Sequence, residues 1–447
     1  MRLKQALACV AEAPRPETLD TFRACIDQAW IRQALDATGT ASLRKRRLPA
    51  EQVVWLVLGM AILRDRSIVS VAESLDIALA GARGPSAAPS AVSQARDRLG
   101  AEPLEWLFGA TAARWSHTGA AARRWRGLAL YGADGTSLRV PDSPENRAHF
   151  GAPRGGCGAV GAYPQARLVA LFALRSHLLV RASFGPYNVG EATYARDLWS
   201  ALPDHSLCVV DKNFFAAHAL LPLARDGTQR HWLIRAKSNA KWRVIERLGE
   251  HDLLVERPVT PAARKADPSL PARWRMRAIR YQRKGFKPSW LLTSLLDPVA
   301  YPAQEIVLLY HERWEIELAY DEIKTEMLDR EEAIRSRSPE RVAQELWGIL
   351  LAYNLVRLEM ERVAEEAKVE PTRISFIVSL HLIRDEWIWS ASGAPGAIPR
   401  HLRKLRANLA RFVLPPRRSN RSYPRAVKIT GSGYLTKRPS RHAAPLK

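Results

Sequence analysis

The stretch from residue 128 to residue 236 constrains the fold of this 447-residue chain more than any other part. Short apolar runs suited to buried strands alternate there with helical patterns, in the order strand, strand, strand, helix, strand, helix, strand. Such an alternation is typical of a mixed α/β sheet, and the second and third strands are expected to pair as a hairpin. The elements are predicted at 128–131, 167–174, 178–183, 191–202, 207–210, 216–224 and 232–236.

Helical patterns precede this sheet, and residues 1–120 are predicted to form an all-α N-terminal domain. Ser67 and Ser90 are candidate N-caps of two of its helices, and Gly100 is expected to stop the second. Short helices with a basic last helix resemble a helix-turn-helix DNA reader. A plain helical bundle with an exposed face explains the pattern at least as well.

The rest of the chain divides into four regions by composition and periodicity. Two long helices are expected near 303–327 and 339–368, and no internal repeat is present. The predicted regions are 121–240, the first part of the core; 241–290, a β-rich insertion; 291–370, the second part of the core; and 371–447, a helical, basic C-terminal region.

The positive charge is concentrated in two segments. The chain has 68 Lys and Arg against 45 Asp and Glu, a net charge of +23. Residues 391–447 hold 14 basic residues and no acidic one, and residues 230–290 hold 16 basic against 5 acidic residues. Two such segments favour a nucleic acid as partner, because Lys and Arg neutralise phosphates. A solubilising tail plus a solvated strand face is the alternative.

Other partners and compartments fit the sequence less well. No apolar stretch reaches the length of about 18 residues that spans a bilayer, so no membrane association is expected. The four cysteines form no Cys-x-x-Cys pair, which disfavours a zinc or redox site. Because the N-terminus also lacks a secretion signal, we expect a cytoplasmic, nucleoid-associated protein. The cysteines are Cys9, Cys25, Cys157 and Cys208.

The predicted helix at 303–327 carries a polar stripe. At about 100° per residue, Tyr310, Arg313, Glu317 and Lys324 fall within about 60° of one another. Ile316 and its apolar neighbours form an adjoining stripe that can pack on a sheet. A carboxylate beside two cations and a phenol suits a metal-bound phosphate and a DNA backbone. Taken alone, the geometry favours the alternative, an amphipathic surface helix with ordinary ion pairs such as Arg313 with Glu317.

Two further carboxylates, Asp134 and Asp211, each follow an apolar run and are predicted at strand ends. An aspartate there either caps a turn or points into a cleft, and capping is the commoner role for one such residue. Two of them on neighbouring strands, facing Glu317 on a covering helix, could hold two divalent ions. Oxygen ligands suit Mg²⁺, and a pair of ions supports phosphoryl transfer.

The motif Tyr310-x2-Arg313-x3-Glu317-x6-Lys324 resembles the signature of the bacterial insertion-sequence transposases of the IS-four family. The segments around Asp134 and Asp211 resemble that family too, in the expected order. The resemblance extends from about Leu48 to Lys428 and includes the segments 345–348, 352–355 and 423–428.

The resemblance implies an RNase H-like catalytic core in which Asp134, Asp211 and Glu317 form a DDE triad. These three residues would be catalytic and would bind two Mg²⁺ ions, which Mn²⁺ can replace. The implied reaction is cleavage at the element ends followed by strand transfer into target DNA, by a route that can include a DNA hairpin. The implied partners are the terminal inverted repeats and the target DNA, held by a homodimer in a synaptic complex.

The other motif residues, Tyr310, Arg313 and Lys324, would then hold terminal phosphates. A hairpin also requires a flipped base, which stacks on an aromatic side chain. Trp290, at the exit of the insertion, and Trp314, beside Arg313, are the candidates. For both tryptophans the alternative is a place in the core or in an interface.

Two other classes of protein compete with a transposase. A non-catalytic DNA-binding protein or regulator derived from a transposase has the same charge and predicts that Asp134 and Glu317 are dispensable. A glycosidase also uses two carboxylates, but the charge of +23 and the lack of an aromatic-rich cleft argue against it.

His311 lies off the polar stripe, where we expect a structural or solvent-facing residue.

Overall fold

The protein is described here from a computed structural model. The described residues are 26, 28–41, 48–75, 88–153, 161, 163–283, 287–328, 334–390 and 398–415. Several features of the sequence lie outside them, namely Cys9, Cys25, Cys157 and the basic end at 423–428.

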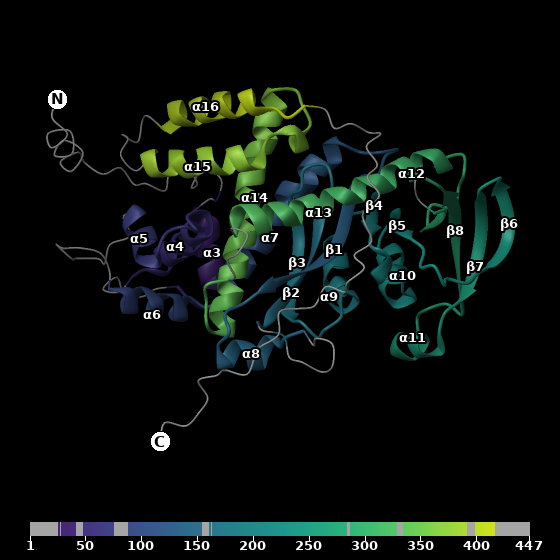
Figure 1. Cartoon of the computed structure of the whole chain (residues 1–447), viewed down its shortest axis with the longest axis horizontal. Helices are drawn as coiled ribbons and strands as arrows, with labels where there is room; N and C mark the ends of the chain where they lie inside the picture. Colours follow the sequence, from purple (N-terminus) through teal and green to yellow (C-terminus); the bar gives the residue numbers. More distant parts are fainter. Residues whose placement is uncertain are drawn as a thin grey trace, which may run out of the picture.

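The strands among the described residues form one large mixed sheet, which confirms the predicted α/β class. The strands are β1 (Ala129–Arg139), β2 (Gln165–Ala173), β3 (Leu179–Pro186), β4 (Ser206–Val210), β5 (Arg230–Arg235), β6 (Arg243–Gly249), β7 (Asp252–Pro258), β8 (Arg273–Tyr281) and β9 (Ser289–Thr293). Their spatial order is β3-β2-β1-β4-β5-β9-β8-β7-β6 (Figure 1). Strands β1, β4 and β5 pair in parallel, and the other neighbours pair antiparallel, including the expected β2–β3 hairpin.

Strands β6 to β9 occupy most of the segment predicted as a β-rich insertion. They continue the same sheet, because β9 pairs with β5 through Leu233–Thr293 and Arg235–Leu291. The sheet therefore extends without interruption from the hairpin β2–β3 to the edge strand β6.

Helices cover both faces of the sheet (Figure 1). The helices beside and after the strands are α8 (Pro144–Phe150), α9 (Glu191–Leu198), α10 (Ala217–Arg225), α11 (Pro261–Ala266), α12 (Ala303–Tyr310), α13 (Trp314–Asp321), α14 (Pro339–Glu366), α15 (Phe376–Ser390) and α16 (Ile398–Leu409). Leu130 and Leu207 face a core shared with α13 and α14, whereas Tyr131 and Cys208 face one shared with α9 and α10. We call these two sides the α13 face and the α10 face.

Short 3-10 and π turns complete the chain. They are the 3-10 turns Trp199–Ala201, Lys212–Phe214, His311–Arg313, Pro371–Arg373 and Ala410–Phe412 and the π segment Glu322–Met327. The helix predicted at 303–327 is thus α12 and α13 joined by a 3-10 turn and extended by the π segment (Figure 1).

The N-terminal region is helical, as predicted. Its described helices are α3 (Gln28–Ala37), α4 (Ala50–Ile62), α5 (Ile68–Ser74), α6 (Pro89–Leu99) and α7 (Glu102–Ala122). The Ser67 hydroxyl accepts from the Ser70 amide and caps α5, as expected. The prediction for Ser90 is wrong, because Pro89 already occupies the first turn of α6 and Ser90 lies inside the helix. Gly100 ends α6 with φ of 70°.

Helix α14 runs through the interior between the N-terminal helices and the sheet (Figure 1). It is buried around its whole circumference from Gln344 to Arg357, as is typical of a helix inside a core. Asn354 joins it to β3, because its side-chain amide pairs with both the amide and the carbonyl of Leu179, at 2.8 and 2.9 Å. Arg96 of α6 is also buried, with its Nε donating to Gln344 at 2.7 Å, so this arginine is not part of an exposed DNA-reading face.

No helix in these described ranges has the length and apolar character needed to cross a membrane.

Candidate active site

The two aspartates lie next to each other on adjacent strands. The parallel pairing of β1 and β4 ends at Ala133 and Val210, and the next residue on each strand is an aspartate. Because side chains alternate along a strand, Asp134 and Asp211 both point to the α13 face. Asp211 follows the end of β4, as predicted. The prediction of a strand end at Asp134 is wrong, because β1 continues to Arg139 by pairing with β2.

Helix α13 crosses β1 at a glycine, which brings its polar stripe over the aspartates. A Cβ atom on Gly132 would lie 2.6 Å from Cδ1 of Ile316, so only glycine permits this close approach. Arg313 then lies between two carboxylates, with Nη2 2.7 Å from Glu317 Oε1 and Nη1 3.5 Å from Asp134 Oδ2. Glu317 and the aspartates are thus brought together from segments 183 and 106 residues apart in the chain.

Burial and neighbouring charges shift the pKa values of Asp134 and Arg313. Burial raises the pKa of Asp134 to about 7, and the charge of the nearby Asp211 contributes, although the Gly135 amide donates to Asp134 at 2.8 Å. Burial also disfavours the charge of Arg313, but the hydrogen bond to Glu317 and the charges of Tyr310, Glu317 and Asp134 together outweigh this, so the pKa of Arg313 lies above its ordinary value. A cation beside Asp134 would stabilise its ionised form.

The other two residues of the motif flank the cluster. Tyr310 is buried at the end of α12, and burial raises the pKa of its phenol to about 12. Lys324, in the π segment, donates to Thr136 Oγ1 of β1 at 3.2 Å. All four motif residues therefore lie on the α13 face, near the middle of β1 and the carboxyl end of β4.

Two residues that were not predicted from the sequence also lie next to the aspartates. Arg235 follows Asp211 in the row across the parallel strands, since Val210 pairs with Ile234, and its charge influences the pKa of Tyr310. Glu191 of α9 reaches the aspartates from the α10 face, through the space left by Gly135. A Cβ on Gly135 would lie 2.6 Å from the Glu191 carboxyl carbon. Arg235 follows a buried apolar run, as Asp134 and Asp211 do, so the same signal was present for it.

The carboxylate of Glu191 adds negative charge to the cluster. Burial raises the pKa of Glu191, and the charge of Asp211 raises it further, although Arg167 opposes the shift from 3.3 Å.

The remaining candidates have different surroundings. Trp314 lies at the start of α13 and is 46% exposed. Trp290 lies on β9 and points to the α10 face, where its ring meets Trp242 edge-on at 5.6 Å. His311 packs against Tyr281, with the ring centroids 6.3 Å apart, and lies 3.5 Å from Arg283.

The donor set fits a divalent metal ion, but the present arrangement does not enclose one. Asp134, Asp211 and Glu317 supply the carboxylate oxygens that Mg²⁺ and Mn²⁺ prefer. Within the described residues, no three His, Cys, Asp or Glu side chains converge tightly enough to hold an ion. Arg313 occupies the space between Asp134 and Glu317, so these two carboxylates already share a cation.

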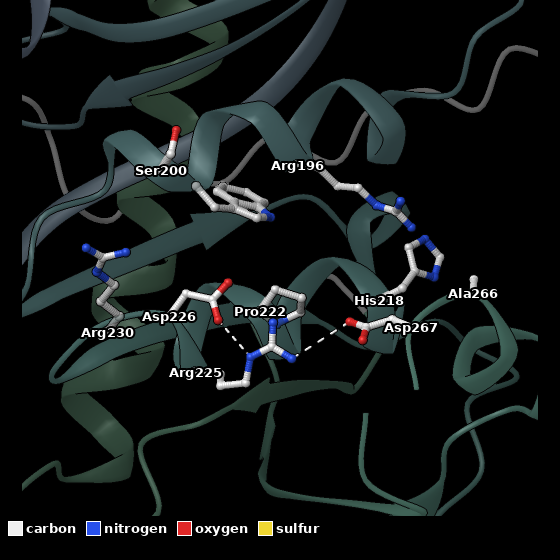
Figure 2. A pocket seen from close by; sticks show the side chains of 10 residues that line it. Arg196, Ser200, His218, Pro222, Arg225, Asp226, Arg230, Ala266 and Asp267 are labelled. Carbon is white, nitrogen blue, oxygen red and sulfur yellow. Dashed lines mark hydrogen bonds and ion pairs between the residues drawn. The ribbon is translucent and has the colours of Figure 1, made fainter. Parts of the chain in front are cut away.

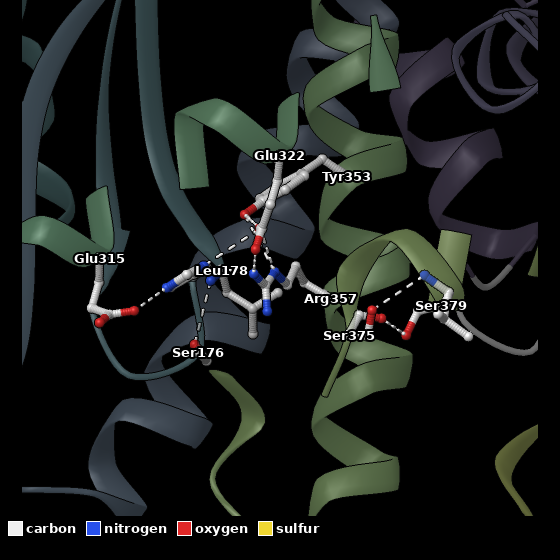
Figure 3. A network of polar contacts seen from close by, with 10 residues as sticks. Ser176, Leu178, Glu315, Glu322, Tyr353, Arg357, Ser375 and Ser379 are labelled. Atoms are coloured by element: carbon white, nitrogen blue, oxygen red, sulfur yellow. Dashed lines mark hydrogen bonds and ion pairs between the residues drawn. The ribbon is translucent and has the colours of Figure 1, made fainter. Parts of the chain in front are cut away.

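The turn between β2 and β3 holds the helix that carries Glu317. Arg175 donates to both carboxylate oxygens of Glu312, at 2.9 and 2.8 Å. Nε2 of His177 lies 2.8 Å from Oε2 of Glu315 (Figure 3). The hairpin and the helix are therefore fixed to each other by side-chain contacts.

The π segment is anchored by a second, enclosed ion pair. Glu322 accepts hydrogen bonds from Arg357 of α14 and, at 2.8 Å, from the Tyr353 hydroxyl (Figure 3). Burial alone would raise the pKa of Glu322, but the facing Arg357 and His177 outweigh it and lower the pKa to about 2. This pair joins the end of the Glu317 helix to the central helix α14.

A cavity of about 620 Å³ lies on the other side of the sheet, between α9, α10 and α11. Its walls include Arg196, His218 and Arg225, and Arg225 is paired with Asp226 and Asp267 (Figure 2). None of the carboxylates of the cluster lines this cavity. The cluster instead lies on the α13 face, where the side chains of Asp134 and Glu317 are 20% and 34% exposed.

Comparison with known proteins shows that the chain is similar to transposases. A family model described as the transposase DDE domain matches residues 130–355, and one described as the insertion element 4 transposase N-terminal region matches residues 16–109. The chain is 40% identical over 405 residues to the transposase InsG for insertion sequence element IS4 of Escherichia coli strain K12, a match that covers 90% of each chain. It is 36% identical over 232 residues to the putative transposase InsZ of the same organism, covering 52% of this chain and 76% of the relative.

Among solved structures, a cryo-EM structure of a piggyBac transposase synaptic complex with hairpin DNA matches at 10% identity with a TM-score of 0.43. That match covers 90% of this chain and 86% of the piggyBac chain. The two sequence comparisons decide the family, because the DDE model spans half of the chain and the IS4 relative spans nine-tenths of it. The chain belongs to the IS4 family of DDE transposases, enzymes that act on DNA with divalent metal ions.

Proposed function

We propose that this transposase cuts DNA at the two ends of its own element and joins them to a target, with Asp134, Asp211 and Glu317 as the catalytic residues. The observation that carries this proposal is the adjacency of the two aspartates under Glu317, in a protein whose family performs transposition.

We propose that these three carboxylates hold two Mg²⁺ ions, which Mn²⁺ can replace. Bound divalent ions activate the attacking oxygen and stabilise the leaving oxygen of an in-line phosphoryl transfer. For Glu317 to bind a metal, Arg313 must move from its position between the carboxylates. The released guanidinium can then bind a phosphate of the DNA, because it can donate two parallel hydrogen bonds to such a group.

Tyr310, Arg313 and Lys324 would hold the phosphates next to the cleaved bond. Replacement of Arg313 or Lys324 by Ala should weaken the complex with element ends more than it weakens binding to unrelated DNA. An equal loss for both kinds of DNA would identify a general phosphate-binding surface instead.

Trp314 is suited to stack on a base flipped out at a DNA hairpin, because nearly half of its surface is exposed beside Arg313. Trp290 is a weaker candidate, since its ring packs on Trp242 on the other face of the sheet. Trp314→Ala should slow hairpin formation and leave the first nick unchanged.

We also propose a role for each region of the chain. Residues 1–120 would bind element ends, 121–240 and 291–370 would form the RNase H-like core, 241–290 would be its β-rich insertion, and the basic region 371–447 would bind DNA. Joining two element ends requires two active sites, so we propose a homodimer in the synaptic complex.

The test is strand cleavage of DNA that carries the ends flanking the gene. The wild-type protein is incubated with Mg²⁺, with Mn²⁺ or with EDTA, beside Asp134→Ala and the control Asp226→Ala. Asp226 is an exposed carboxylate on the α10 side that pairs with Arg225. We expect metal-dependent nicks at one position for the wild type and the control, and none for Asp134→Ala. Binding without nicks would favour a transposase-derived regulator.

A further inference from the structure

A cluster of three arginines lies on β6 and β8, far along the sheet from the carboxylates. Arg243, Glu256 and Arg275 are direct neighbours across β6, β7 and β8, and Arg273 lies two residues away on the same side of β8. The three guanidinium groups lie 3.1, 3.8 and 2.6 Å from Glu256, for Arg243, Arg275 and Arg273 respectively. We call these residues the arginine triad.

The triad has more positive charge than its own carboxylate can neutralise. The hydrogen bond from Arg273 lowers the pKa of Glu256, so this acid stays ionised, and three cations share its single charge. The Glu256 side chain is only 6% exposed, whereas the three arginine side chains are 60–71% exposed. A buried carboxylate therefore orients three guanidinium groups whose other donors face solvent.

The neighbouring Arg277 shows what an arginine with a purely structural role looks like on the same strand. It is fully buried, it pairs with Asp252 through both nitrogens, and it also donates to the backbone carbonyl of Tyr301 at 2.6 Å. Arg277 matches one carboxylate to one cation. The triad, whose Arg275 and Arg273 lie two and four residues earlier on β8, lacks this balance.

The triad lies on the α13 face, which is also the face of the catalytic carboxylates. Neighbouring positions across β4, β5, β9 and β8 are Asp211, Arg235, Leu291 and Ile279, so their side chains lie on one face of the sheet. Arg275 is four residues from Ile279 on β8, and because side chains alternate along a strand it lies on that face too. Four strand spacings of about 4.8 Å and an offset of four residues of about 3.3 Å give roughly 23 Å between Asp211 and Glu256. This distance equals about seven base pairs of duplex DNA at about 3.4 Å each.

We propose that the arginine triad binds backbone phosphates of the DNA being cut, about seven base pairs from the cleaved bond. The proposal rests on the DNA-cleaving function proposed above. Guanidinium groups on a rigid sheet match phosphate oxygens in geometry, and the two excess charges match two phosphates. Such contacts would position the duplex without reading its sequence.

The test removes the excess charge and keeps the structure. Arg243→Gln combined with Arg275→Gln leaves Arg273 paired with Glu256 at 2.6 Å, so the fold should survive. The control, Arg264→Gln with Lys265→Gln, removes the same charge from exposed positions of α11 on the α10 face. Thermal unfolding of both variants confirms that they are folded.

Binding of a duplex of 40 base pairs is then measured by fluorescence anisotropy over a series of salt concentrations. The slope of log K against log salt should become shallower by about 2 for the triad variant, because each lost phosphate contact contributes about 0.9. Affinity near 0.1 M salt should fall by about tenfold, and the control should keep the wild-type slope. An unchanged slope, or an equal change in the control, would overturn the proposal.

Phosphate ethylation interference separates this proposal from the proposed cleavage. Interfering phosphates about seven base pairs from the nick should disappear in the triad variant, while its nicking of a duplex cut short before that point should equal that of the wild type. If the wild-type protein cuts no DNA, the proposed function fails, but the salt slopes still test whether the triad binds DNA phosphates. If the triad variant keeps every interfering phosphate while cleavage proceeds, only the triad proposal fails.

Discussion

Glu317 and Glu322 lie five residues apart on one continuous helical segment, and each faces an arginine, yet they differ in exposure and in the set of groups around them. Glu317 is 34% exposed and shares Arg313 with Asp134. Glu322 is enclosed by Arg357, Tyr353 and His177. The first pair can open toward a substrate, whereas the second has every partner inside the protein.

The difference shows how one helix can be held rigid and still present a reactive group. The enclosed pair, together with the contacts of Glu312 and Glu315, fixes the helix to the β2–β3 turn and to α14. The exposed pair lies beside Asp134, whose pKa is raised to about 7 mainly by burial and also by the charge of Asp211. Unfavourable electrostatics near Asp134 are thus tolerated because other parts of the same helix are well satisfied.

The largest expected effect is on catalysis. Glu317→Gln should lower cleavage by about a thousandfold or more, since a metal ligand supplies several kcal/mol of transition-state stabilisation. DNA binding should persist, and the free energy of unfolding should change by less than about 1 kcal/mol because the ion pair is partly exposed. Gel-based cleavage and anisotropy measure the two properties. Cleavage at the wild-type rate would remove Glu317 from the triad.

The second effect is on stability. Glu322→Gln leaves Arg357 buried without a counter-charge, which should lower the free energy of unfolding by about 3–5 kcal/mol. The matched control is Asp97→Asn, whose partner Arg341 is partly exposed, with an expected loss below about 1 kcal/mol. Urea unfolding compares the two. Similar losses would mean that the Glu322 pair is not the anchor of this helix.

The third effect is a pH dependence that belongs to the enclosed pair. The pKa of Glu322 is about 2 in the folded protein against an ordinary value of 4.5, so its contribution is complete above pH 4.5 and is lost as the pH falls toward 2. The contribution is of the order of 3 kcal/mol from this difference in pKa. The free energy of unfolding, measured between pH 6 and pH 3, should fall more steeply for the wild type than for Glu322→Gln. Parallel curves would contradict the assignment.

The smallest effect concerns the crossing of α13 over β1. Gly132→Ala inserts a methyl group 2.6 Å from Ile316 and from Leu174, which should cost about 1–3 kcal/mol and displace Glu317. Cleavage should fall more than DNA binding, and the added change Ile316→Val should restore part of the activity by removing the clashing Cδ1. Gly190→Ala is the control, since no atom lies within 4 Å of the position that a Cβ would take there. Equal effects of the two alanines would show that the close approach is unimportant.

Much of the fold follows from local patterns. The short apolar runs identified β1 to β5 and the β2–β3 hairpin, and Ser67 and Gly100 marked helix ends where the structure has them. Ser90 failed as a cap because Pro89 suits the first helical turn better. Asp134 failed as a strand end because antiparallel pairing with β2, a contact distant in sequence, extends β1 beyond it.

Residue spacing alone specifies the periodicity of the strands, the polar stripe of Tyr310, Arg313, Glu317 and Lys324, and the order of the carboxylates. Which residues share a face and which charges have partners depends on how the strands pair and the helices pack. The sheet register set Arg235 beside Asp211, and the absent side chain of Gly135 admitted Glu191 from the other face. Long-range pairing and packing create these neighbours, so no local pattern could have identified Arg357 and His177 as the partners of Glu322.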